Sequence, residues 1–303
     1  MAENQGVNGD MWNNCAVNLL KLFGWEHIGD KNIDLVGTDS QEYGIDALMC
    51  YKSPSMAIKQ SCLVESKRYS LNSLNASMLK KWIERLRQKL DALYQSEELV
   101  IEFPTMCDCC AINLGLIMCW IHDAPNEVYF HDDFTKYLSK AIISTMPKPM
   151  SYKRIVVLTN PQIIRLCAVA EQISKGGYQF VYPSQLINDR PLVRSKILSV
   201  EYATSNTILA ERINKDKYES VIFYFGLISI DAFRSLYESL IMYNILECEK
   251  KVMIYYYENN IKIREITPEI KKIFKDVDLE LKALTHYTIS IEPSIIKDYD
   301  DEQ

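Results

Sequence analysis

Ser61-Cys62-Leu63-Val64-Glu65-Ser66-Lys67 is a run of apolar residues that ends in an acid and a lysine. The apolar part predicts a buried strand, and the side chains of a strand point alternately to its two faces. Glu65 and Lys67 are two residues apart, so they share one face and place a carboxylate beside an ammonium. The stretch therefore predicts a strand whose end carries the functional site of the chain.

A second carboxylate lies upstream, in the predicted strand Tyr43-Gly44-Ile45-Asp46-Ala47-Leu48-Met49-Cys50-Tyr51. From a neighbouring strand, Asp46 can form a pair of carboxylates with Glu65. Two carboxylates and a lysine are the groups needed to bind Mg²⁺ and to direct water at a phosphodiester. We therefore predict catalytic roles for Asp46, Glu65 and Lys67, with the two carboxylates and the backbone carbonyl of Ser66 as metal ligands.

The tripeptide Glu-x-Lys is not specific by itself, because it occurs four times in the chain. Glu249-Lys251 precedes an apolar strand and is interpreted as a charged turn. Glu269-Lys271 and Glu280-Lys282 lie in lysine-rich stretches, for which helices with solvated faces are predicted. Only Glu65-Lys67 ends an apolar strand with a Gly-Ile-Asp strand before it and a basic helix after it. This copy is therefore predicted to form a site rather than an edge-strand salt bridge.

In its order of helix, Gly-Ile-Asp strand, Glu-Ser-Lys strand and basic helix, the N-terminal part of the chain resembles the PD-(D/E)xK nuclease superfamily. The resemblance implies an α/β fold with a restriction-endonuclease-like αβββαβ core and Mg²⁺ as cofactor, which Mn²⁺ can replace. It also implies DNA rather than RNA as substrate, endonucleolytic cleavage and 5′-phosphate ends. The chain is further similar to nuclease subunits of two-gene bacterial phage-defence systems, which implies anti-phage defence with a partner protein.

Two features depart from the superfamily pattern. Ile45 stands before Asp46 where many members have proline, and the first predicted helix carries no glutamate that could face the site. Asn14 in that helix can orient a ligand or a water molecule, but it brings no negative charge. Asp34 is either a third metal ligand or an ordinary residue at the end of a strand.

Positive residues are concentrated between Lys67 and Lys89, where Glu84 is the only acidic residue. Helical spacing puts three polar residues of this stretch on one face, which predicts contact with a phosphate backbone. The alternative is an exposed amphipathic helix with an apolar face in the core, and both can hold because opposite faces do different work. The predicted DNA-binding residues are Arg68, Lys80, Lys81, Arg85 and Gln88.

The composition is that of a globular protein of 303 residues, with 48% hydrophobic residues and a formal net charge of −6. No apolar run is long enough to predict a membrane span, and the first residues show no secretion signal, so a cytoplasmic protein is expected. The nine cysteines are scattered and are interpreted as reduced thiols. A zinc site around Cys107, Cys109, Cys110, Cys119 and His122 is a less favoured alternative, because Cys119 lies within a predicted apolar strand.

Met146-Pro147-Lys148-Pro149 predicts a linker between domains at residues 1–147 and 148–303. Beyond it, predicted strands alternate with helices, which indicates a second α/β domain with a mostly parallel sheet. No glycine-rich phosphate-binding fingerprint is present, so this domain is expected to bind a partner protein or a second copy of the chain. A DNA-holding or assembly scaffold that depends on a partner, and a nucleotide-sensing effector, remain alternatives to an active nuclease. The predicted strands are Arg154–Leu158, Tyr178–Tyr182, Ser220–Phe225 and Lys251–Tyr257.

Overall fold

The computed structural model describes residues 7–54, 59–94, 96–108, 112–123, 134–141, 153–183, 192–214, 217–246, 251–256 and 261–284. The chain divides into two compact units, one running up to Ile164 and the other taking in Arg165–His286. The division falls inside helix α5 (Asn160–Ser174).

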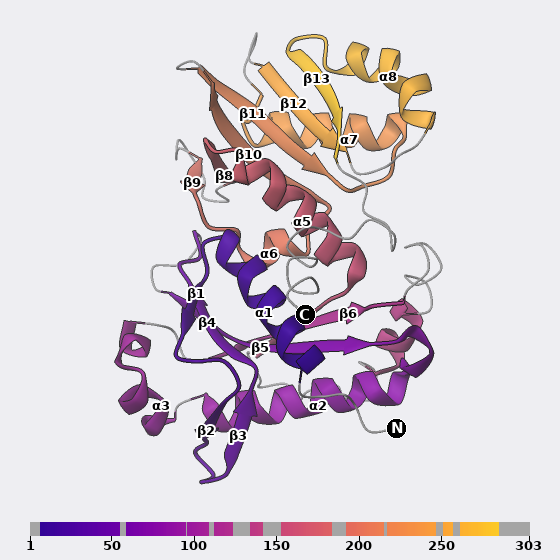
Figure 1. The fold of residues 1–303 in the computed structure, drawn as a ribbon. Coiled ribbons are helices and arrows are strands. Elements are labelled where there is room, and N and C mark those ends of the chain that lie inside the picture. The colour runs from indigo at the N-terminus through magenta and orange to yellow at the C-terminus, as the bar shows by residue number, and fades with distance from the viewer. Residues whose placement is uncertain are drawn as a thin grey trace. The chain divides into compact units, whose positions relative to one another are not determined.

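The first unit is built around a five-stranded mixed sheet (Figure 1). Its first three strands are antiparallel neighbours and its last three are parallel neighbours. All eight residues of the fourth strand in this order are buried, as the apolar sequence predicts for a central strand. In spatial order the strands are β1 (Glu26–Ile28), β4 (Ala47–Tyr51), β5 (Gln60–Tyr69), β6 (Leu114–Ile121) and β7 (Arg154–Leu158).

The predicted strand Tyr43–Tyr51 is broken at Asp46. Its first part, β3 (Glu42–Ile45), pairs with β2 (Ile33–Val36) in a separate two-stranded sheet, and only its second part, β4, enters the main sheet. The carbonyl of Asp46 accepts a hydrogen bond from the Asn32 amide at 3.0 Å. Asp46 therefore lies at the corner where the chain leaves the hairpin and joins the sheet.

Helix α1 (Val7–Leu22) covers one face of the main sheet. Trp12 attaches this helix to β6, since its indole Nε1 donates to the Met118 carbonyl at 2.9 Å and its ring stacks on Trp120. Both β6 residues point to the same face because they are two apart. The polar residues of α1 that face the sheet therefore lie on the same side of it as the Trp120 side chain.

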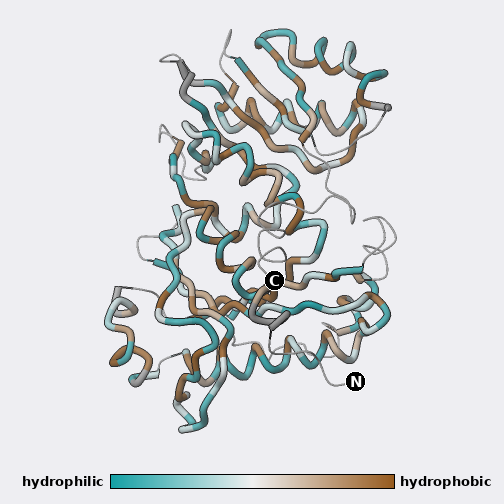
Figure 2. Tube along the Cα trace, in the orientation of Figure 1, coloured by the Kyte–Doolittle hydropathy of each residue, from teal (hydrophilic) through white to brown (hydrophobic). Residues whose placement is uncertain are grey.

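Helix α2 (Ala76–Leu93) covers the opposite face, and Figure 2 shows hydrophilic and hydrophobic residues alternating along it. The Asn75 side chain caps it by accepting from the Met78 amide at 3.0 Å. A Cβ at Gly115 of β6 would lie 2.7 Å from Leu86 Cδ2, so a larger residue at this position would require Leu86 to shift. The predicted apolar face is confirmed, and its buried residues include Leu79, Trp82, Leu86, Leu90 and Leu93.

Shorter helical segments complete the described part of the first unit. They pack at its edges and contribute Leu99, Met106, Phe134 and Ala141 to the core that α2 shares with the sheet. These segments are η1 (Leu71–Ser73), α3 (Glu97–Glu102), η2 (Pro104–Asp108) and residues 134–141.

Strand β7 belongs to the first sheet and does not open a second domain as the sequence predicts. It runs parallel to β6, with Leu114 opposite Arg154 and Met118 opposite Leu158. The predicted linker Met146-Pro147-Lys148-Pro149 lies outside the described residues. The chain thus returns to the first sheet after these prolines, and the first compact unit reaches Ile164.

The second unit contains a six-stranded sheet that is mixed, not mostly parallel as the sequence predicts. Three neighbouring strands at one edge pair in parallel, whereas the remaining neighbours in the sheet pair antiparallel. In spatial order the strands are β13 (Asp278–Ala283), β12 (Lys251–Tyr256), β11 (Lys217–Tyr224), β10 (Thr207–Asn214), β8 (Tyr178–Tyr182) and β9 (Val193–Ser195).

The parallel part of this second sheet has helices in its connections, α7 (Ile230–Met242) and α8 (Ile261–Ile273). Both pack on one face of the sheet, where Phe233 and Phe274 are buried against Ile222 and Ile254. The short helix α6 (Val200–Ala203) precedes β10. In the described parts of the chain, no helix has the length and apolar character needed to cross a membrane.

Candidate active site

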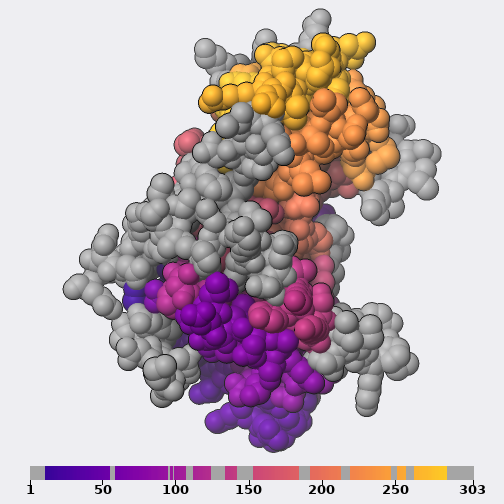
Figure 3. Space-filling model, turned by 90° about the vertical axis from the view of Figure 1, so that its right-hand side faces the viewer, coloured from indigo at the N-terminus to yellow at the C-terminus, as the bar shows by residue number. Residues whose placement is uncertain are grey.

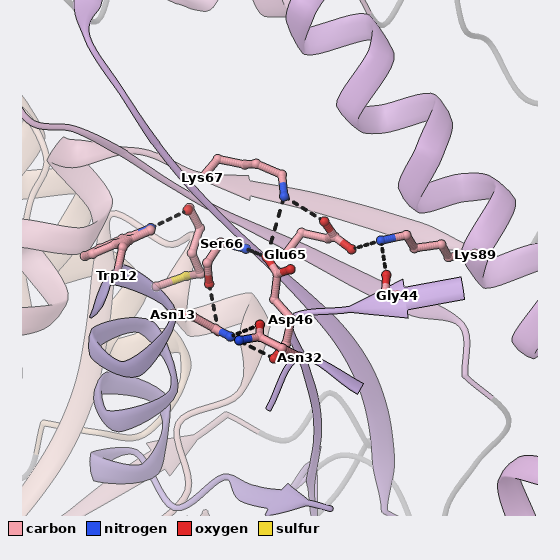
Figure 4. A network of polar contacts seen from close by, with 10 residues as sticks. Trp12, Asn13, Asn32, Gly44, Asp46, Glu65, Ser66, Lys67 and Lys89 are labelled. Carbon is pink, nitrogen blue, oxygen red and sulfur yellow. Dashed lines mark hydrogen bonds and ion pairs between the residues drawn. The ribbon is translucent and has the colours of Figure 1, made fainter. Parts of the chain in front are cut away.

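Glu65 and Lys67 lie at the end of β5, on the face of the main sheet that α2 covers (Figure 4). The Lys67 Nζ is 2.8 Å from Glu65 Oε2 and 3.5 Å from Asp46 Oδ2. One ammonium therefore contacts both carboxylates, one from β5 and the other from the corner between β3 and β4. The structure brings together the three residues that the sequence places in the catalytic centre.

Asp46 is held in position through both its side chain and its backbone. Its Oδ2 accepts a hydrogen bond from the Ser66 amide at 2.6 Å, and its carbonyl accepts from Asn13 Nδ2 at 2.8 Å. The Ser66 hydroxyl also donates to Asn13 Oδ1 at 3.2 Å. These contacts tie the corner at Asp46 to β5 and to α1, so the carboxylate has little freedom to move away.

Asn13, rather than the predicted Asn14, is the α1 residue that supports the site. Asn13 is buried, and its Nδ2 also donates to Asn32 Oδ1 at 3.0 Å. Asn14 instead accepts a hydrogen bond from Lys31. A signal for Asn13 is present in the sequence, because it shares helical spacing with the buried Val17, whereas its neighbour points about 100° away on the helix.

Lys89 of α2 is a site residue that the sequence interpretation does not assign. Its Nζ forms an ion pair with Glu65 Oε1 and donates to the Gly44 carbonyl of β3. The two Glu65 oxygens are thus divided between two ammoniums, with Lys67 on one and Lys89 on the other (Figure 4). Helical spacing from Leu86 places Lys89 at the edge of the buried face of α2.

The two carboxylates respond oppositely to their surroundings. Burial raises the pKa of Asp46, and the nearby charge of Glu65 raises it further, outweighing the effect of Lys67 and of the Ser66 amide. Burial also works to raise the pKa of Glu65, but Lys67 and Lys89 together hold that pKa below its ordinary value of 4.5. The pKa of Lys67 is raised because Glu65 and Asp46 outweigh the cost of its burial. At neutral pH Glu65 is therefore the firmly ionised member of the pair.

The donor set fits a hard divalent cation such as Mg²⁺. Asp46 and Glu65 offer only oxygen, and Mg²⁺ is usually bound through one or two carboxylates together with water and substrate phosphates. In the described ranges, no group of three or more His, Cys, Asp or Glu side chains is arranged to hold a metal. Asp34 is exposed on β2, so among the described residues the carboxylates that meet at Lys67 are Asp46 and Glu65.

The predicted DNA-binding residues do not all share one surface. Lys81, Arg85 and Gln88 are exposed and follow helical spacing along one side of α2. Lys80 is half-buried and lies 3.8 Å from Glu84. Arg68 points to the opposite face of β5 from Lys67, because adjacent strand residues alternate. Part of the surface formed by the first unit is visible in Figure 3, in indigo to magenta.

Among the described residues, neither the cysteines nor the polar residues at the end of β7 form a second reactive centre. Cys119 is a free, buried thiol whose pKa is raised by burial to about 12. Cys109 and Cys110 lie outside the described residues. Thr159 and Asn160, where β7 meets α5, have their polar groups engaged within the fold, since the Asn160 side chain bonds both backbone groups of Ile121.

Comparison with known protein families gives a match over the range that contains this site. The model of the GAPS4 protein PD-(D/E)XK nuclease domain matches residues 1–162, more than half of the chain. The matched range contains Asp46, Glu65, Lys67 and Lys89, and it extends through β7.

Similarity to other proteins is weak. Among curated proteins none matches. The solved structures that align include Aa-Ago with externally bound siRNA at 11% identity and a TM-score of 0.21, and A. aeolicus Argonaute at 14% identity and a TM-score of 0.20. Each alignment covers 84% of this chain and 40% of the Argonaute chain. Similarity of this degree supports no inference about fold or substrate.

Proposed function

The chain belongs to the family of the GAPS4 protein PD-(D/E)XK nuclease domain, and from that premise we propose that it is a Mg²⁺-dependent endonuclease acting on DNA. The observation that supports this most is the convergence of Asp46 and Glu65 on the ammonium of Lys67. A carboxylate pair with one lysine supplies metal ligands and a positive charge at the same place.

In the proposed reaction, water attacks a backbone phosphorus and the bond to the 3′ oxygen breaks, leaving a 5′ phosphate. Asp46 and Glu65 would hold the cation, with the Ser66 carbonyl as a further ligand. A bound divalent cation lowers the pKa of its water and offsets charge that develops on the phosphate. Lys67, held by both carboxylates, orients the attacking water and neutralises a phosphate oxygen. The hydrogen bonds from Ser66 and Asn13 to Asp46 keep its carboxylate in position relative to Glu65 and Lys67.

The exposed side of α2 is the proposed DNA-binding surface. Lys81, Arg85 and Gln88 lie on the same helix as Lys89, which reaches the Glu65 carboxylate. Contacts of such residues to phosphates would position the backbone without reading its sequence.

The test is cleavage of supercoiled plasmid by the full chain with Mg²⁺ or Mn²⁺, comparing wild type with Lys67→Ala and Asp46→Asn. We expect metal-dependent nicking by the wild type and none by either variant, because each loses a group at the reacting phosphate. Full activity in both purified variants would contradict the site assignment. Absence of cleavage by all three proteins, with DNA still bound in a gel-shift assay, would favour a scaffold or a nuclease that awaits a partner.

We further propose that the nuclease acts in bacterial anti-phage defence together with a partner protein or a second copy of the chain. This proposal rests on the family and on the resemblance of the sequence to nuclease subunits of two-gene defence systems. Phage plating on cells that express the complete system tests it, with Lys67→Ala as the inactive form. Equal plating on cells with wild type and variant would remove the proposal.

A further inference from the structure

Lys89 occupies a position that a divalent cation must share. Its ammonium pairs with Glu65 Oε1, while Lys67 pairs with Glu65 Oε2 at 2.8 Å. Both oxygens of the more buried carboxylate are therefore already neutralised. The side chain of Glu65 is 9% exposed and that of Lys89 is 17% exposed, so solvent screens this pair only weakly.

The charges of the site also balance without a cation. Asp46 and Glu65 contribute two negative charges, and Lys67 and Lys89 contribute two positive charges. A site with both carboxylates and Lys67 alone would carry a net negative charge and would attract a cation more strongly. The ammonium from α2 removes that attraction.

From these contacts, and on the basis of the proposed function, we infer that Lys89 is an internal counter-ion that competes with the divalent metal for Glu65. It is a positioning residue in the free protein, because it holds the carboxylate in place until a cation displaces it. The Gly44 carbonyl makes the displacement feasible, since Lys89 already donates to it and keeps that partner when Glu65 is released.

A purely structural role for Lys89 is the competing explanation. The lysine connects α2 to β3 through its hydrogen bond to the Gly44 carbonyl, and such a contact could contribute to stability alone. The two explanations differ in what happens when the charge is removed. Loss of a structural tie leaves metal affinity unchanged or weaker, whereas loss of a competitor makes it stronger.

The experiment measures binding of Mn²⁺ alone to the full chain, without nucleic acid, by titration calorimetry or electron paramagnetic resonance. Lys89→Met and Lys89→Gln remove the ammonium, and two neutral variants guard against misfolding of one. Lys89→Arg keeps the charge. Lys59→Met is the matched control, because Lys59 pairs with Glu26 at 2.7 Å elsewhere in the first unit and its loss changes the net charge equally.

We expect both neutral variants to bind Mn²⁺ about tenfold more tightly than wild type, with Lys89→Arg and Lys59→Met within about twofold of it. The gain should disappear in the double variant Lys89→Met/Asp46→Asn, which places the bound ion at the site. Unchanged or weaker binding in folded Lys89→Met and Lys89→Gln overturns the inference.

The outcome also separates this inference from the proposed function. Unchanged affinity in the neutral Lys89 variants, with wild type binding Mn²⁺ and cutting plasmid, rejects the competition and leaves the nuclease intact. Tighter binding by the neutral variants, with no plasmid cleavage by wild type, supports the competition and counts against nuclease activity of the chain without a partner. If wild type and all Lys89 variants fail to bind Mn²⁺, the inference is overturned and the metal dependence of the proposed function falls with it.

Discussion

At the scale of single residues, Asp46 and Glu65 carry the same functional group under opposite electrostatic conditions. Asp46 is partly buried beside another carboxylate, and its pKa is raised. Glu65 is nearly fully buried but lies between two ammoniums, and its pKa is lowered. The ionised form of Asp46 therefore costs folding free energy, whereas the ionised form of Glu65 stabilises the fold.

Replacing each carboxylate by its amide should consequently change stability in opposite directions. Asp46→Asn keeps an acceptor for the Ser66 amide and removes an unfavourable charge, so the free energy of unfolding should rise by about 1 kcal/mol. Glu65→Gln leaves Lys67 and Lys89 without their shared counter-ion, so the free energy of unfolding should fall by about 3 kcal/mol. Urea unfolding of both variants at neutral pH measures the two changes. A loss of stability in Asp46→Asn equal to that in Glu65→Gln would contradict the assignment of the two roles.

The same argument fixes the pH dependence of these differences. The pKa of Glu65 is lowered from 4.5, so its contribution is present above that pH and is lost as the pH falls through the lowered value. The pKa of Asp46 is raised from 3.8, so the gain in Asp46→Asn is present at neutral pH and disappears as the pH falls toward 3.8. Repeating the unfolding below about pH 4 should therefore narrow both differences from wild type.

Glu280 and Lys282 show why a tripeptide alone does not define a site. The sequence predicts a helix for this pair, but it lies in β13, where the two side chains share a face and form an ion pair at 3.0 Å. Local geometry thus resembles that of Glu65 and Lys67. The difference is burial, because the Glu280 side chain is 38% exposed, and it becomes apparent only when distant segments have folded together.

At the scale of secondary structure, α2 performs two tasks on different sides. Its apolar residues pack on the sheet, where Leu86 touches the position of Gly115. Its exposed side carries Lys81, Arg85 and Gln88. A helix can separate these functions because residues three and four apart share a side while adjacent residues do not.

Charge removal on the exposed side should weaken DNA binding and leave the fold intact. For Lys81→Gln/Arg85→Gln, the slope of the logarithm of the binding constant against the logarithm of salt concentration should decrease by about 2, one for each lost phosphate contact. Gel-shift titrations over a range of salt measure this slope. The matched control is Lys271→Gln/Lys275→Gln, which removes two exposed charges at the same spacing near α8. An equal change in both double variants would indicate a general charge effect and no binding surface on α2.

The sequence predicts most elements that are defined by local patterns. The buried strand β6, the apolar face of α2 and the strand β8 (Tyr178–Tyr182) follow from apolar runs and helical spacing. Pairing between strands is not local, so neither the place of β7 in the first sheet nor the break at Asp46 follows from the local sequence pattern. The local pattern does not reveal the role of Lys89 for the same reason, since its partner Glu65 is 24 positions away and on another element.

At the scale of the whole molecule, the chain has two compact units, each with its own sheet and its own apolar core. The candidate site is built entirely from residues of the first unit, and the matched family range also ends within it. Side chains of Leu90 in α2 and Leu240 in α7 are buried in the cores of the first and second units, respectively. These two leucines make it possible to perturb one core at a time.

Leu90→Ala and Leu240→Ala should each lower the stability of one unit by about 2–5 kcal/mol, because both substitutions leave a cavity in a packed core. In differential scanning calorimetry of the full chain, we expect two transitions, with each variant shifting a different one to lower temperature. Mn²⁺ binding should be impaired at elevated temperature only in Leu90→Ala, since the carboxylates belong to the unit that contains Leu90. A single transition lowered equally by both substitutions would instead show that the two units unfold together.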